Sequence, residues 1–120
     1  MPDSRDPRGF LPLSNLSFHL LLALGAGESH GYALGKEIED RSNGRLRPTT
    51  GSLYQALKRL ADDGLIERAP DVARISTDGR RQYFRLTGLG RAVTAAEAAR
   101  LHELVRLAAE RDLFMLPAGA

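Results

Sequence analysis

The sequence predicts a mainly α-helical domain with a small β-hairpin, an α+β fold built around one core and followed by a long C-terminal helix. Three observations lead to this prediction. Residues 49–66 begin with hydroxyl groups, repeat apolar side chains at helical spacing and end near a glycine. A basic turn and an alternating run follow at residues 78–86. Residues 87–114 consist largely of good helix formers.

Two helices are expected at the start of the domain. The first begins after Ser14 or Ser17 and continues through residues 16–24, which are apolar nearly all round and should therefore lie at the centre of the fold. The second runs from about residue 31 to residue 42 after a cap at Ser29. Its core-facing side chains are expected to be Tyr32, Leu34 and Ile38.

The third helix is expected to start near Thr50 and to run to about Asp63, because Gly64 suits the left-handed residue that follows a helix. Its apolar residues recur at positions i, i+4 and i+7, which places them on one stripe. They are Leu53, Leu57 and Leu60. The side chains that lie away from this stripe are polar, hydroxylated or basic, so this helix can present a polar face.

A hairpin is expected after the third helix. A strand begins at residues 65–68, a turn follows at residues 78–79, and the return strand covers residues 82–86. A helix with a polar and basic face, followed by a basic hairpin, is the pattern of a winged helix-turn-helix. Such a pattern makes double-stranded DNA the leading candidate partner.

The distribution of charge favours the same partner. The net charge is only +2, but eleven basic and five acidic residues lie between residues 41 and 91, so that segment carries +6 and the remainder −4. Basic charge gathered on one segment is typical of a site for a polyanion. The alternative interpretation is a solvated surface with scattered arginines.

Seven residues of the third helix and four arginines of the hairpin are the candidate DNA contacts. Gln55 can make two hydrogen bonds to adenine, and Lys58 suits guanine or phosphate. Gly51 permits a close approach to the DNA backbone, and the Tyr54 hydroxyl can bind a phosphate. The alternatives are simple capping for the first turn and a solvated basic turn for the hairpin. The candidates are Thr49, Thr50, Gly51, Ser52, Tyr54, Gln55, Lys58, Arg74, Arg80, Arg81 and Arg85.

The last helix is expected to run from a cap at Thr87 to about residue 114 and to mediate dimerisation. A small domain can bury only its first turns, so the exposed apolar stripe needs a partner, and a second copy of the chain is the economical one. The alternative is that this helix folds back on its own domain. The stripe consists of Leu101, Leu104, Val105 and Ala108.

These elements divide the chain into four parts. Residues 1–13 are expected to form a mobile arm, residues 14–86 the winged helix-turn-helix, residues 87–114 the dimerisation helix and residues 115–120 a tail. The arm lacks the apolar core of a secretory signal, which favours a cytoplasmic protein.

Composition excludes several classes of function. The chain has no cysteine, so disulfides and thiolate metal ligands are excluded. The longest apolar run, residues 20–24, is far shorter than a membrane span, so no membrane partner is expected. The three histidines are dispersed and no catalytic set is recognisable. We therefore expect no enzyme, no cofactor and no metal.

The sequence resembles the PadR family of bacterial winged-helix transcriptional regulators. Six motifs carry the resemblance in the order and spacing of that family, between about residues 16 and 91. They are LLLAL at 20–24, HGY at 30–32, GSLYQALKRL at 51–60, GLI at 64–66, GRRQYFRLT at 79–87 and GR at 90–91. The sequence departs from the family at three positions, because Thr50 and Gln55 stand where proline is common and Ala61 where an acid is frequent.

The resemblance implies a homodimeric repressor with a roughly palindromic operator. In this family the third helix enters the major groove, the wing flanks it and the C-terminal helices of two copies cross. Some members release DNA when a small aromatic or drug-like compound binds near the dimer interface, which adds a small hydrophobic effector to the candidate partners.

Two other functions stay open at this point. A winged-helix module can bind a protein through the same face, since fold does not dictate function. A small-molecule-binding protein without a DNA role would need a defined pocket. Candidate wall residues for that pocket also fit core and dimer contacts, and they are Phe18, Leu22, Leu101, Leu104 and Val105.

Overall fold

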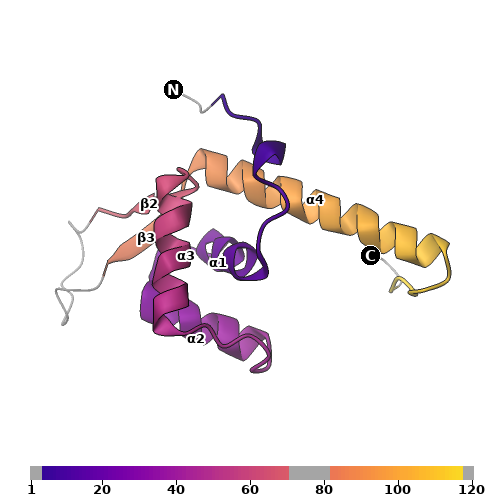
Figure 1. The fold of residues 1–120 in the computed structure, drawn as a ribbon, viewed down its shortest axis with the longest axis horizontal. Coiled ribbons are helices and arrows are strands. Elements are labelled where there is room, and N and C mark those ends of the chain that lie inside the picture. The colour runs from indigo at the N-terminus through magenta and orange to yellow at the C-terminus, as the bar shows by residue number, and fades with distance from the viewer. Residues whose placement is uncertain (1–3, 71–81, 118–120) are drawn as a thin grey trace.

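The computed structural model describes residues 4–70 and 82–117. In these two ranges it contains four α-helices, a short 3₁₀ helix and a small antiparallel sheet (Figure 1). The predicted α+β class, mainly helical with a small sheet, is confirmed. The elements are η1 (Pro7–Phe10), α1 (Asn15–Gly25), β1 (Ser29–His30), α2 (Gly31–Arg41), α3 (Thr50–Asp62), β2 (Ile66–Arg68), β3 (Tyr83–Leu86) and α4 (Gly88–Glu110).

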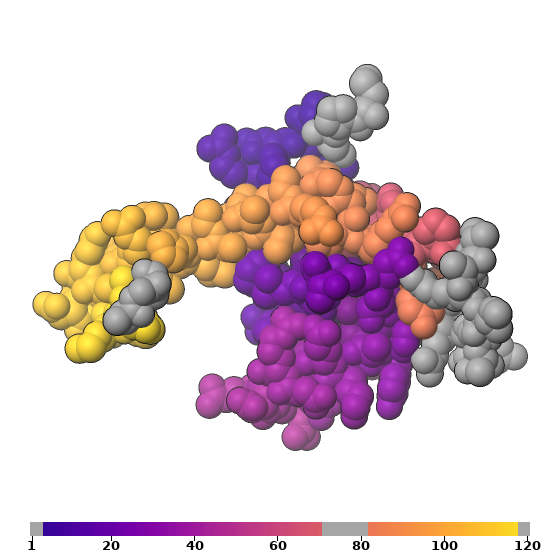
Figure 2. Space-filling model, turned by 180° about the vertical axis from the view of Figure 1, so that it is seen from behind, coloured from indigo at the N-terminus to yellow at the C-terminus, as the bar shows by residue number. Residues whose placement is uncertain are grey.

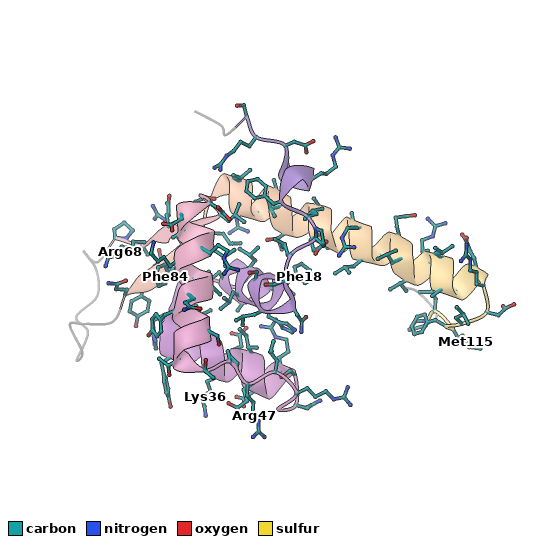
Figure 3. All side chains as sticks on the ribbon, in the orientation of Figure 1. Phe18, Lys36, Arg47, Arg68, Phe84 and Met115 are labelled. Carbon is teal, nitrogen blue, oxygen red and sulfur yellow. The ribbon has the colours of Figure 1, made fainter. Side chains whose placement is uncertain are left out.

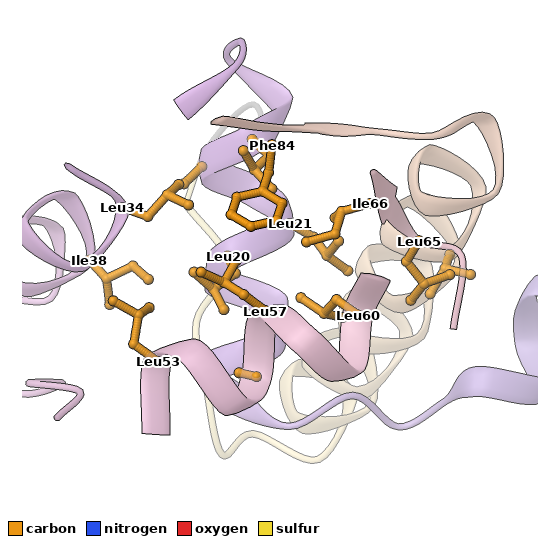
Figure 4. Close-up of a cluster of buried hydrophobic side chains, with 14 of the residues drawn as sticks. Leu20, Leu21, Leu34, Ile38, Leu53, Leu57, Leu60, Leu65, Ile66 and Phe84 are labelled. Atoms are coloured by element: carbon orange, nitrogen blue, oxygen red, sulfur yellow. The ribbon is translucent and has the colours of Figure 1, made fainter. Parts of the chain in front are cut away.

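Helix α1 lies at the centre of the fold, as its apolar character predicts. Its side chains Leu20, Leu21 and Leu24 are almost completely buried. The helix contacts α2, α3, α4 and β3, and Figure 4 shows Leu20 and Leu21 between the apolar stripe of α3 and the side chains of α2 and the sheet. Full burial of one leucine side chain contributes about 1.5–3 kcal/mol, so this contact holds α3 firmly in place.

Side-chain caps fix where three of the helices begin. The hydroxyls of Ser14, Thr49 and Thr87 accept hydrogen bonds from backbone amides three residues later, at 3.1, 3.1 and 3.0 Å, as the sequence predicts. The predicted cap of α2 was wrong, since Ser29 belongs to β1. His30 caps this helix instead, because its Nδ1 atom accepts from the amide of Ala33 at 3.4 Å.

The sheet has three strands in the order β1-β3-β2, and both pairings are antiparallel. Strand β1 pairs Ser29 with Phe84, and β2 pairs Ile66 with Leu86. The hairpin strands lie near the predicted positions. The third strand was not predicted, because two residues are too few to show the alternation that identifies a strand.

The N-terminal segment packs across α4, whereas the sequence predicted a mobile arm (Figure 1). Phe10, Leu11 and Leu13 pack against the hydrophobic core. The amide of Leu13 also donates a hydrogen bond of 2.8 Å to Oε2 of Glu97, in the middle of α4. The two residues are 84 positions apart in the chain, so no local pattern could indicate the contact.

Glu97 is a buried acid on an otherwise apolar face of α4, with a side chain that is almost inaccessible to solvent. Its Oε1 atom accepts from Nε of Arg100 at 2.5 Å. The hydrogen bond from Arg100 is the main cause of a lowered pKa for Glu97, and the amide of Leu13 contributes, while burial opposes both. The carboxylate therefore ties the N-terminal segment to α4 in its ionised form.

We expect the substitution Glu97→Gln to reduce the free energy of unfolding by about 1–2 kcal/mol at neutral pH, because a charged acceptor is lost. The pKa of Glu97 in the folded chain lies below the ordinary 4.5, so its stabilisation is complete above that value and disappears as pH falls through the folded pKa. Urea unfolding between about pH 7 and pH 3 should therefore show the two proteins converging at low pH. Glu103→Gln on the exposed face is the control, and parallel curves for Glu97→Gln would contradict the assignment.

Helix α4 begins against the sheet and then leaves the domain. The amide of Thr87 donates to the carbonyl oxygen of Leu65 at 3.1 Å. Gly90 lies directly on the same carbonyl, because a Cβ atom at this position would be only 1.9 Å from its oxygen. The last turns of α4 project from the domain in Figure 2, where the yellow end stands clear of the other elements. Within the described residues, no helix combines the length and hydropathy needed to cross a membrane.

Candidate nucleic-acid interface

Helix α3 separates its side chains into a buried and an exposed face. Leu53, Leu57 and Leu60 are buried as predicted. The predicted contacts on this helix and at its cap all lie on the exposed side, and they are Thr49, Thr50, Gly51, Ser52, Tyr54, Gln55 and Lys58. The structure therefore places these seven residues together, along the first two to three turns of one helix.

Two of the hydroxyl groups at the start of α3 bind each other. The Thr49 hydroxyl donates to Oγ of Ser52 at 2.9 Å, and the Ser52 hydroxyl donates to the backbone oxygen of Thr49 at 3.1 Å. Because both hydroxyl hydrogens are engaged inside the turn, these side chains offer acceptor lone pairs to a ligand. Thr50 and Gln55 are therefore better placed to donate hydrogen bonds outward.

Each of the two basic candidates in the described part of the chain is paired with an acid. Nζ of Lys58 lies 2.9 Å from Oδ2 of Asp62, one turn further along α3. Nε of Arg85 lies 2.7 Å from Oε2 of Glu67, its partner in the register of β2 and β3. Exposed pairs of this kind contribute about 0–1 kcal/mol, so a phosphate can displace the acid at small cost.

The predicted wing contacts are only partly visible in the structure. Arg85 is half-buried at the base of the hairpin, where it joins the two strands. The other three arginines predicted to contact DNA lie outside the described residues, and they are Arg74, Arg80 and Arg81.

Tyr54 connects the start of α2 to α3. Its side chain is half exposed, and its ring lies against Gly31, where an added Cβ atom would be 2.6 Å from the tyrosine oxygen and 2.8 Å from Cζ. A side chain at position 31 would push the tyrosine ring away from this position. Gly31 is the middle residue of the HGY motif. Its contact with Tyr54 becomes apparent only when α2 and α3 are placed together.

Helix α2 adds residues that the sequence analysis missed. Tyr32 was expected in the core, but 69% of it is exposed. Leu34 and Ile38 are the buried residues, and Tyr32 lies two positions before Leu34, which turns it to the opposite side of the helix. Tyr32 and Lys36 instead line a pocket of about 280 Å³ with Thr50 and Tyr54 of α3.

The residues predicted for dimerisation lie on the projecting part of α4. Leu101 and Ala108 are half-buried, whereas Leu104 and Val105 are exposed at 51% and 38%. The helix ends at Glu110, somewhat before the predicted residue 114, and a left-handed residue at Asp112 turns the chain. Apolar side chains on an isolated, projecting helix form a surface that favours association with another apolar surface.

Comparison with known proteins identifies the family. Residues 20–96 match the model of the transcriptional regulator PadR-like family. The chain belongs to this family. The protein is therefore a PadR-like transcriptional regulator, and membership of this family implies DNA binding.

Individual proteins resemble this PadR-like chain in sequence or in fold. It is 37% identical to a transcriptional regulator of Mycobacterium tuberculosis over 89 residues, which cover 73% of this chain and 77% of the relative. It is 40% identical over 88 residues to an uncharacterised protein of a Streptomyces fradiae transposon, but the match spans only 22% of that longer protein and 73% of this chain. A PadR family regulator from Clostridium difficile shares the fold, with a TM-score of 0.65 at 22% identity over 79% of this chain and 95% of the other.

Proposed function

We propose that this PadR-like chain is a homodimeric repressor that binds a roughly palindromic operator through α3. Family membership supplies the class of regulator. The observation that carries the proposal is the exposed face of α3, where hydroxyl, amide and ammonium groups are presented by a helix whose other face is firmly buried. A rigid helix with a polar face of this kind fits the major groove of B-DNA.

The individual groups on α3 suit different parts of DNA. Gln55 is exposed on α3, about one turn before Lys58. Its side-chain amide can bond both N6 and N7 of adenine. Lys58 can exchange Asp62 for a phosphate or a guanine edge. Apart from its chain neighbours and the backbone of its own helix, no heavy atom lies within 4 Å of the Cβ position of Gly51, so DNA can approach this turn closely.

The proposed dimer explains the exposed stripe of α4. Two copies that cover Leu104 and Val105 against each other would remove apolar surface from water and present two α3 helices related by two-fold symmetry. Such a dimer requires half-sites about 34–36 Å apart along the DNA, or a multiple of that spacing.

Fluorescence anisotropy tests the proposed function directly. The purified protein is titrated into a labelled duplex from upstream of its own gene and into a scrambled duplex, across a series of salt concentrations. We expect a preference of about 100-fold or more for the upstream duplex at about 0.15 M salt, because phosphate contacts alone do not discriminate between sequences. No binding to either duplex at low salt would overturn the proposal and favour a protein partner.

Replacing Gln55 by alanine should relax sequence preference without weakening general DNA binding. A lost bidentate contact costs about 1–3 kcal/mol of discrimination at one base pair of each half-site. Anisotropy on a set of operators with single base changes measures this loss. Arg111→Gln, directly after the end of α4, is a control distant from α3 that should keep the base preference. An unaltered base preference in Gln55→Ala would remove Gln55 from the recognition surface.

A further inference from the structure

A pocket lies between α2 and α3, next to the exposed face of α3. It lies where one face of α2 meets the first turn of α3, and Figure 3 shows Lys36 in this part of the molecule. Its volume of about 280 Å³ falls below the range of roughly 300–1,000 Å³ that is usual for sites of drug-sized molecules. The α2 residues that line it are Tyr32, Gly35, Lys36 and Glu39, and the later ones are Pro48, Thr50, Leu53 and Tyr54.

The shape of the pocket follows from the close approach of the two helices. A Cβ atom on Gly35 would be 3.2 Å from Cδ2 of Leu53, so the glycine lets α2 and α3 pack tightly at the base of the pocket. Longer side chains on either side of this contact then form the walls. The pocket is thus built by the same packing that orients α3.

One cation in the lining of the pocket has no ion-pair partner among the described residues, although Glu37 and Asp40 line a second pocket with it. Glu39 is the acid in the lining, and its Oε1 atom lies 3.6 Å from Nε of Arg47. Lys36 is exposed, and no residue in the described ranges forms a hydrogen bond or ion pair with it. Lys58 and Arg85, by contrast, each hold an acid. Lys36 can therefore bind an anion without first releasing a partner.

Three residues with hydroxyl groups line the same pocket as Lys36. They are Thr50 and the two tyrosines, Tyr32 and Tyr54. An ammonium group beside several hydroxyl groups matches a phosphate, which accepts hydrogen bonds and carries negative charge. In a helix-turn-helix the helix before the recognition helix crosses the DNA backbone, so a phosphate next to the groove entered by α3 would come to this position.

We propose that Lys36 binds a backbone phosphate of the DNA beside the groove that α3 enters, with the Tyr32 hydroxyl as a neighbouring donor. This inference rests on the proposed function and adds α2 to its binding surface. Phosphate contacts position a protein on the duplex and carry no base preference. Lys36 thus contributes to the affinity for DNA and to the position of α3 along the duplex, while Gln55 contributes to the sequence preference.

The test compares Lys36→Gln with the unaltered protein on the upstream and scrambled duplexes. We expect both affinities to fall by the same factor, with an unchanged ratio between them. The slope of log affinity against log salt should become shallower by about 0.9 for each Lys36 that contacts DNA. Lys36→Arg keeps the charge and should keep the slope.

Arg41→Gln is the matched control, because it removes one positive charge from the same helix at a residue already paired with Glu37. An equal change of slope in this control would indicate a general charge effect and overturn the assignment to Lys36. An unchanged slope in Lys36→Gln, with normal binding by the unaltered protein, would overturn it as well. Failure of the unaltered protein to bind any duplex would instead refute the proposed function.

Neutralising single phosphates of the operator locates the contact. Methylphosphonate groups, placed one at a time along each strand, should weaken binding of the unaltered protein at every contacted phosphate, and one of these positions in each half-site should be the Lys36 contact. At that position the same substitution should have almost no further effect on Lys36→Gln, because the two changes remove the same contact. Additive losses at every position would contradict the proposal.

Discussion

Replacing Gly90 by alanine should lower the free energy of unfolding by roughly 3 kcal/mol or more, the upper end of the cost of overpacking a core. The added Cβ atom would lie 1.9 Å from the carbonyl oxygen of Leu65 and 2.9 Å from its carbon. Both are backbone atoms, and the oxygen is held by the amide of Thr87, so no side-chain rotation can relieve the clash. The start of α4 would have to move away from the sheet.

Gly88→Ala provides the control for this substitution. Gly88 lies two residues earlier on the same helix, and a Cβ atom there would meet no heavy atom within 4 Å. Alanine favours the helix over glycine, so Gly88→Ala should be neutral or stabilise the chain by up to about 1 kcal/mol. Chemical denaturation followed by circular dichroism measures both. Equal stability of the two variants would show that Gly90 does not need to be a glycine.

Introducing an arginine at Leu104 should convert the proposed dimer into monomers and reduce operator affinity by about 100-fold or more, because linked half-site binding is lost. Leu104 is half exposed in the single chain, so the arginine can be solvated there without disturbing the core. In the dimer the same charge would lie in an apolar contact.

Sedimentation velocity distinguishes the two states, and anisotropy reports the affinity. Glu103→Arg places the same side chain on the neighbouring, charged face of α4, where Glu103 pairs with Arg106 at 3.4 Å. This control should remain dimeric. If Leu104→Arg also stayed dimeric, the stripe of α4 would not be the dimer interface.

Local patterns predicted α3 almost to the residue. The cap at Thr49, the leucine stripe and Gly64 act over a few positions, and the structure has the helix at Thr50–Asp62 with Gly64 at φ +80°. The burial pattern of this helix also placed the exposed candidates on one face.

Local sequence patterns do not predict contacts between segments that are far apart in the chain. The hydrogen bond from Leu13 to Glu97 and the two-residue strand β1 exist only because separate elements meet. Lys36 lies on the exposed side of α2. Its position beside Thr50 depends on how α2 packs on α3, and the sequence of neither helix contains that information alone.

The contact between Gly31 and Tyr54 links one position on the exposed face of α3 to the packing of α2. The side chain at position 54 packs against α2 at Gly31, so a change there also alters the contact between the two helices. Position 51 has free space around it, and position 55 is exposed to solvent. Descendants of this gene could therefore acquire new operators through positions 51 and 55 while keeping the same scaffold.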